Sequence, residues 1–311
     1  MTLLTSEMNK ELMDPCRLCP RRCGAARLHG ETGYCGARAV VKAARAALHY
    51  WEEPCISGTR GAGAVFFSHC NLGCIYCQNS RISRGGEGEE ITTEHLAEIF
   101  CKLQEQGAHC IDLVTAVHYL PPVCKAIEQA RLAGLRIPTV YNSGGYESAE
   151  ILRMAKGYFD MYMPDLKYVT DGLAAALSNA PDYPSVSLAA IDEMLAQTGP
   201  AQFDGDGIMR RGVLIRHLVL PGHTRESMAV LRLISERWGD DVYVSIMNQY
   251  TPVAGAGQRE GFGELARQVT KREYGKVVDE AIRLGLTHVY IQEGGTAQES
   301  FIPDFDGEGI L

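Results

Sequence analysis

The sequence lacks long apolar runs, and no stretch approaches the roughly eighteen residues that a membrane-spanning helix requires. Basic residues are in deficit, with 30 Lys and Arg against 38 Asp and Glu, and the net charge of −8 argues against nucleic acid as the main partner. Residues 1–14 contain no basic segment followed by an apolar one, so we expect no signal peptide and a cytoplasmic protein.

Cysteine, by contrast, is abundant: all eleven cysteines lie before residue 125. In a secreted protein they would indicate disulfides, whereas in a cytoplasmic protein we expect reduced thiols that can bind metal. The 311 residues, 46% of them hydrophobic, suffice for one large α/β domain with a small appendage. We expect a cysteine-rich metal-binding segment at residues 1–58 and a main domain at residues 59–311.

Cys70, Cys74 and Cys77 follow an apolar stretch, residues 63–67, that we expect to form a strand. Three thiolates at this spacing can hold a cubane iron–sulfur cluster and leave one of its four irons open to a small molecule. The alternatives are buried thiols or zinc, but zinc usually has a fourth protein ligand and favours paired C-x-x-C motifs. We interpret the adjacent His69 as a neighbour, because its coordination would close the site.

With Tyr76 directly before the third cysteine, this run resembles the motif of the radical S-adenosylmethionine (SAM) superfamily. The resemblance implies a 4Fe–4S cluster, SAM bound at the open iron, and an electron donor such as flavodoxin or ferredoxin. It also implies reductive cleavage of SAM to a 5'-deoxyadenosyl radical that abstracts hydrogen. The cofactors would supply this chemistry, while the protein orients them and excludes water.

The rest of the chain alternates short apolar strands with amphipathic helices. We expect strands at residues 64–67, 111–114, 139–141, 161–163, 213–220, 243–246 and 289–291. We expect helices at residues 93–106, 121–133, 148–155, 186–197, 227–237 and 270–284. This order predicts a parallel sheet with right-handed crossovers and ligands at the carboxyl ends of its strands. The pattern does not separate a barrel from a doubly wound sheet, and the family resemblance implies a partial (βα)6 TIM-like barrel.

Polar motifs follow two of these expected strands and lie within a third. Asp165-Leu166-Lys167 resembles the Asp-Leu-Lys motif of glycyl radical enzyme activases such as pyruvate formate-lyase activating enzyme, and Arg216 matches the Arg-x-x-x-x-Pro-Gly run of the same family. Asn142 falls where that family has an Asp-Thr-Asn-Gly motif. The resemblance implies that these residues contact SAM. The alternatives are a local ion pair, a strand arginine that faces solvent and an ordinary turn.

The chain also departs from the activase pattern. The Gly-Gly-Glu motif that receives the SAM amino group is absent, and residues 113–118 stand in its place. Thr115 and His118 are candidate acceptors there, although a core threonine and a histidine at the start of a helix explain them equally well. Residues 247–252 replace a histidine that the family has after the sixth strand.

Cys16, Cys19, Cys23 and Cys35 form a second group with the spacing C-x2-C-x3-C-x11-C. Four thiolates in a short segment suit structural zinc, which would stabilise a segment too small to have its own core. They also suit a second iron–sulfur cluster, either structural or an electron relay, and unligated thiols are the remaining alternative. With this group, the chain resembles an uncharacterised branch of the pyruvate formate-lyase activating-enzyme homologues.

The first hypothesis is therefore a radical SAM enzyme that abstracts hydrogen from a glycyl residue of a partner enzyme. A second keeps the radical chemistry but has a small molecule or a peptide as the substrate. A third is a non-catalytic protein that carries metal or electrons. The sequence leaves the substrate, the reductant, the oligomeric state and the metal of the second cysteine group open.

Overall fold

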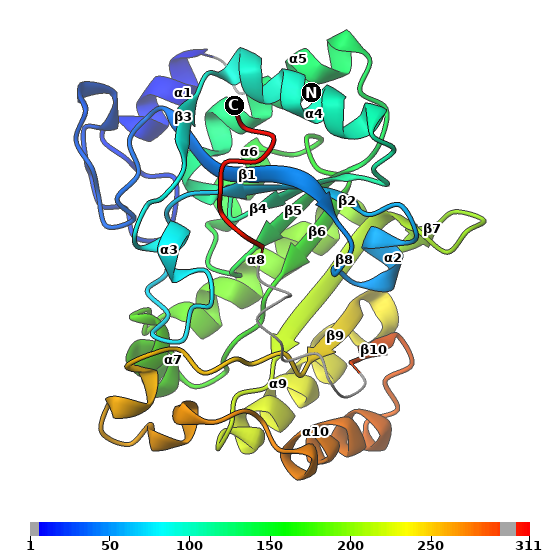
Figure 1. Ribbon diagram of the computed structural model, residues 1–311. Helices are drawn as coiled ribbons and strands as arrows, with labels where there is room; N and C mark the ends of the chain where they lie inside the picture. The colour runs from blue at the N-terminus through cyan, green and yellow to red at the C-terminus, as the bar shows by residue number, and fades with distance from the viewer. Residues whose placement is uncertain (1–5, 293–302) are drawn as a thin grey trace.

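The computed structural model describes residues 6–292 and 303–311. Its centre is a ten-stranded sheet in the order β10-β9-β8-β6-β5-β4-β2-β1-β3, with β7 paired to β8 (Figure 1). The strands from β2 to β10 in that order are parallel: β2 (Ala62–Phe67), β4 (Ile111–Val114), β5 (Thr139–Ser143), β6 (Met161–Pro164), β8 (Met209–Leu218), β9 (Tyr243–Met247) and β10 (Val289–Ile291). All were predicted, and the fold class, a partial TIM-like barrel, is confirmed.

Helices join the parallel strands and cover the outside of the curved sheet (Figure 1). The predicted ones are α4 (Thr93–Glu105), α5 (Leu120–Ala133), α6 (Ala149–Met154), α8 (Tyr183–Thr198), α9 (Thr224–Arg237) and α10 (Lys271–Arg283). On α4, Leu96, Ile99, Phe100 and Leu103 are buried, as their spacing predicts. The shorter α1 (Ser6–Met13), α2 (Pro54–Ser57), α3 (Ser80–Ser83) and α7 (Asp171–Ser178) were not predicted.

Three antiparallel strands were also missed, two of them at one edge of the sheet. β1 (Val41–His49) pairs with β2 and with β3 (Glu89–Ile91), while β7 (Gln202–Phe203) pairs with β8. The composition of β1 explains the omission, because alanine has a low intrinsic preference for strands and the pairing here is tertiary. The expected division at residue 58 therefore falls after a strand that belongs to the main sheet.

The last residues of the chain extend this edge. The Ala46 N–H donates to the Glu308 carbonyl over 2.8 Å, and the Gly307 N–H donates to the Ala44 carbonyl over 3.1 Å. Figure 1 shows the red C-terminal segment crossing β1. No helix in residues 6–292 or 303–311 has both the length and the apolar character needed to cross a bilayer.

The N-terminus of α10 offers a test of local stability. The Thr270 side chain accepts from the Glu273 N–H, and the Glu273 carboxylate accepts from the Thr270 N–H, which is a capping box. Ser148 precedes α6 without a side-chain cap. We expect Thr270→Ala to lower the free energy of unfolding by about 1 kcal/mol and Ser148→Ala to change it by much less, measured by urea denaturation. Equal losses would contradict this account.

Candidate active site

A cavity of about 220 Å³ lies at the carboxyl ends of the parallel strands. Its lining comes from distant parts of the chain and includes Trp51, Glu52, His69, Cys70, Cys74, Tyr76, Cys77, Thr115, Asn142, Ser143, Asp165, Lys167, Arg216, Met247 and Gln249. Parallel strands that end at one edge bring these residues together. The cavity is therefore where the sequence analysis predicted a site, and all but one of the cofactor residues predicted there line it.

Cys70, Cys74 and Cys77, the cluster triplet, lie in the loop after β2. Each sulfur has a hydrogen-bond partner: the Leu72 N–H donates to Cys70 Sγ over 3.4 Å, Ser178 Oγ lies 2.9 Å from Cys74 Sγ, and Ser83 Oγ lies 3.3 Å from Cys77 Sγ. Such contacts stabilise metal-bound thiolates. Burial, reinforced by Cys74, raises the pKa of Cys70 to about 12, so binding of a metal would release its proton.

Tyr76 connects to the triplet through a buried chain of hydroxyl groups. Its Oη lies 2.5 Å from Tyr168 Oη, which lies 2.8 Å from Ser178 Oγ, the partner of Cys74. The ring of Tyr76 lines the cavity beside the thiols. This arrangement fixes both the ring and the second cysteine.

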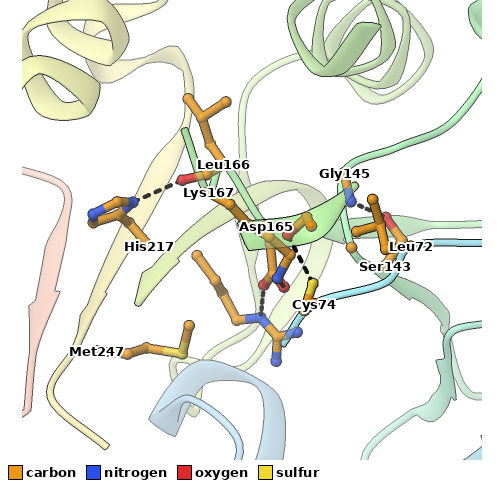
Figure 2. A network of polar contacts seen from close by, with 12 residues as sticks. Leu72, Cys74, Ser143, Gly145, Asp165, Leu166, Lys167, His217 and Met247 are labelled. Atoms are coloured by element: carbon orange, nitrogen blue, oxygen red, sulfur yellow. Dashed lines mark hydrogen bonds and ion pairs between the residues drawn. The ribbon is translucent and has the colours of Figure 1, made fainter. Parts of the chain in front are cut away.

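Asp165, after β6, is the centre of the polar network in the cavity. Lys167 Nζ donates to its Oδ2 over 2.5 Å, and Arg216 Nε donates to its Oδ1 over 3.2 Å. Figure 2 shows Asp165 next to Cys74. Burial opposes ionisation of Asp165, but the charges of Lys167 and Arg216 outweigh it and lower the pKa of the carboxyl. The cavity thus contains fixed charges of both signs beside the thiols.

Arg216, on β8, has two further acceptors. Its Nη2 donates to Asn142 Oδ1 over 2.6 Å, and its Nη1 donates to Glu52 Oε2 over 3.2 Å. Asn142 in turn donates to Asp112 over 3.1 Å. The network holds the guanidinium in one orientation and links β4, β5, β6 and β8.

Of the two candidate acceptors Thr115 and His118, the first lies at the cavity and the second does not. Thr115 lines the cavity with a φ of +62° and donates its N–H to the Asn142 carbonyl over 2.8 Å. His118 is buried away from the lining, and its Nε2 lies 2.8 Å from the Ser68 carbonyl. Burial lowers the pKa of His118 to about 3, so the ring is neutral. The structure does not bring His118 to the cavity and places it instead under the loop that carries the triplet.

Glu52 and Asp112 belong to the site but were missed by sequence reasoning. Asp112 is buried and the Glu52 side chain is 10% exposed, and desolvation raises the pKa of both carboxyl groups although Arg216 opposes the shift. Asp112 stands alone in the apolar strand Ile-Asp-Leu-Val, which is a signal that could have identified it. Glu52 lies in a loop and has no comparable signal.

Cys16, Cys19, Cys23 and Cys35, the head cysteines, also lie together. Burial raises the pKa of Cys19 to about 12, opposed by the backbone near Arg21 and reinforced by the other three thiols. Cys23 Sγ lies against Gly33, where a Cβ would be 2.2 Å from the sulfur. In the described part of the chain, no three Cys, His, Asp or Glu side chains are arranged to hold a single metal ion.

Comparisons with known proteins define the class. Residues 64–234 match the model of the radical SAM superfamily, and since this is more than half of the chain, the protein belongs to that superfamily. It is therefore a radical SAM enzyme, and its cofactors are a 4Fe–4S cluster and SAM. The donor set fits them, because three thiols and a charged network share one cavity. This membership favours catalysis over the non-catalytic metal carrier.

The individual proteins that resemble this chain share little sequence identity with it. An uncharacterised protein of Methanocaldococcus jannaschii, MJ0674, is 25% identical over 293 residues, which cover 92% of this chain and 80% of the relative. The FeFe-hydrogenase maturase HydG has a similar fold, with a TM-score of 0.50 and 14% identity over 77% of this chain and 53% of the maturase. HydG from Carboxydothermus hydrogenoformans has a TM-score of 0.47 and 14% identity over 77% of this chain and 55% of its own. The chain thus spans about half the length of the solved maturases.

A substitution at Gly145 tests whether close packing of its loop positions Asp165 in the site. It has a φ of +79°, and a Cβ there would lie 1.9 Å from the Asp165 carbonyl oxygen. Gly134 has a φ of +115° but nothing within 4 Å of a Cβ. We expect Gly134→Ala to cost about 1 kcal/mol of unfolding free energy and Gly145→Ala more than about 2 kcal/mol, with loss of SAM binding by calorimetry. Normal SAM binding by Gly145→Ala would refute this role.

Glu147, a buried carboxyl next to Ser143, provides a pH prediction. Burial raises the pKa of its carboxyl from 4.5 to about 8, a shift that Ser143 opposes. Between these pH values the folded state binds more protons than the unfolded chain, so stability falls as pH rises. Relative to Glu147→Gln, the wild type should lose at most about 1.4 kcal/mol more per pH unit in this window, measured by denaturation. As a control, the exposed Glu236→Gln variant should show the same pH dependence of stability as the wild type. A Glu147→Gln protein with the wild-type pH dependence would contradict the raised pKa of Glu147.

Proposed function

We propose that the cluster triplet holds the 4Fe–4S cluster, that the cavity binds SAM, and that the enzyme abstracts hydrogen from a glycyl residue of a partner enzyme. The observation that carries the proposal is the shared cavity, in which the triplet lies beside the network of Asp165, Lys167 and Arg216. When bound, the cluster and SAM supply a 5'-deoxyadenosyl radical that abstracts hydrogen.

The chain's own residues orient SAM in this proposal. Lys167 is the cation for the SAM carboxylate, and it also acts electrostatically on Cys74. Asp165 and Asn142 accept from SAM donors, with Arg216 holding both in place. Tyr76 and Thr115 complete the lining. Because these groups are held by one another, they need little reorganisation when SAM binds.

Exposed aromatic residues at the cavity support a protein substrate. Trp51 lines the cavity while it is 61% exposed, and the neighbouring Tyr50 is 52% exposed. Exposed aromatic side chains of this kind are enriched in protein interfaces. The Asp-Leu-Lys and Arg-x-x-x-x-Pro-Gly motifs support a glycyl radical enzyme as the partner.

A second candidate substrate is a small molecule or a peptide. It is favoured by the part of the lining formed by Met247 and Gln249, where the activases have a histidine, and by the missing Gly-Gly-Glu motif. Substrate contacts in this part of the cavity would then differ from those of an activase.

The first test is formation of 5'-deoxyadenosine. Anaerobically reconstituted protein, reduced with dithionite in the presence of SAM, should release it, and Cys74→Ala should not, because two thiols hold the cluster poorly. Cys101→Ala, a partly buried thiol outside both groups, should behave as the wild type. No 5'-deoxyadenosine from a fully loaded wild type would refute the proposal.

The second test concerns the substrate. Incubation of the reduced enzyme and SAM with pyruvate formate-lyase should give a glycyl radical signal by electron paramagnetic resonance. Formation of 5'-deoxyadenosine without that signal, across a panel of glycyl radical enzymes, would replace the activase function by the second candidate.

A further inference from the structure

The head cysteines lie directly against the loop of the cluster triplet. Gly36, next to Cys35, packs on the ring of His69, next to Cys70, and a Cβ on Gly36 would lie 3.0 Å from His69 Nδ1. Each contact residue is one Cα step of about 3.8 Å from a cysteine. The two cysteine groups are therefore joined by a short path through packed atoms.

A second contact joins the same two loops. Arg21, between Cys19 and Cys23, donates from its Nε to the Asn71 carbonyl over 3.0 Å, and Asn71 is the residue after Cys70. The segment that carries the head cysteines is thus fixed to the triplet loop at two points.

Arg27 places a buried positive charge on the head cysteines. It is 1% exposed, its Nη1 lies 3.8 Å from Cys16 Sγ, and its Nε has no partner. Among the described residues, no carboxylate forms an ion pair with it. A buried guanidinium without a counter-ion is costly, and metal-bound thiolates would supply the missing negative charge.

We propose that the head cysteines bind a second iron–sulfur cluster, which passes electrons singly from an acidic one-electron carrier protein to the cluster at the triplet. This inference rests on the proposed role of the triplet. The carrier is oxidised by one electron and the triplet cluster is reduced by one, with no bond made or broken at the head. Zinc has no redox chemistry and could not take part.

The place of the head cysteines favours a cluster over zinc. They lie against the triplet loop at two points, through Gly36 with His69 and through Arg21 with Asn71. Such proximity serves electron transfer between two clusters, whereas zinc would have no use for it.

The surface around the head cysteines suits an acidic partner. Residues 1–50 contain eight Lys and Arg and four Asp and Glu, although the whole chain carries −8. Arg17, Arg22 and Arg38 are exposed there, and Cys23 is exposed as well. The site thus reaches the surface at a locally basic region, where opposite charge would steer a carrier such as reduced flavodoxin.

Metal analysis and Mössbauer spectroscopy test the cluster. The anaerobically reconstituted wild type should contain about eight irons per chain, Cys16→Ala/Cys19→Ala about four and Cys101→Ala about eight. Arg27→Gln should lower the reduction potential of the second cluster, while Arg27→Lys should largely preserve it. Zinc in the head, or about four irons in the wild type, would overturn the proposal.

Rapid-mixing electron paramagnetic resonance tests the relay. The triplet cluster is identified by the change that SAM makes to its signal. Its reduction by flavodoxin should slow by an order of magnitude in Cys16→Ala/Cys19→Ala, while 5'-deoxyadenosine formation with dithionite stays at the wild-type rate. Equal reduction rates with flavodoxin would overturn the relay. Failure of the loaded wild type with dithionite would instead refute the proposed function.

If the double cysteine variant does not fold, a variant that retains every thiol still tests where the carrier binds. Arg17→Glu/Arg38→Glu should keep about eight irons and slow reduction by flavodoxin but not by dithionite. Arg225→Glu/Arg272→Glu, on exposed positions of α9 and α10, is the matched control and should behave as the wild type. An equal effect of the two charge reversals would exclude carrier binding at the head.

Discussion

The position of the segment from Asp165 to Lys167 is the constraint on which the rest of the site depends. The Leu166 N–H donates to the Arg216 carbonyl, the Leu166 carbonyl contacts His217 Nδ1 over 2.7 Å, and Gly145 lets the neighbouring loop approach the Asp165 carbonyl (Figure 2). The backbone of β5, β6 and β8 is thereby locked in one register. Only then does the Asp165 carboxylate lie between two cations, where their charges compensate its burial.

The cluster triplet and the charged network line one cavity, and the segment with the head cysteines packs against the triplet loop. The triplet loop is held from below by His118, which contacts Ser68, and from the N-terminal side by Gly36. The N-terminal segment is therefore packed on the rest of the protein. Its strand β1 belongs to the main sheet, and the residues beside its cysteines contact the triplet loop. Under the proposed relay, radical chemistry and the supply of electrons would be neighbouring functions of one structure.

Sequence reasoning succeeded where the signal is local. The apolar runs of the parallel strands and the spacing on α4 are read from consecutive residues, and the cluster triplet lies within eight. It failed where distant contacts decide. Alanine-rich β1 is a strand because β2 pairs with it, and His118 turns away from the cavity because Thr115 adopts a positive φ and the chain then enters a short 3-10 turn (Val117–Tyr119).

The sequence by itself determined the alternation of strands and helices, the three thiols after the first parallel strand and the motifs at Asp165 and Arg216. These features follow from side-chain chemistry and spacing along the chain. Only the tertiary structure decided that Glu52 would join Arg216, 164 residues away, and that the head cysteines would lie beside the triplet. Such contacts depend on how the loops and strand ends pack against one another, and the spacing of residues along the chain does not specify this packing.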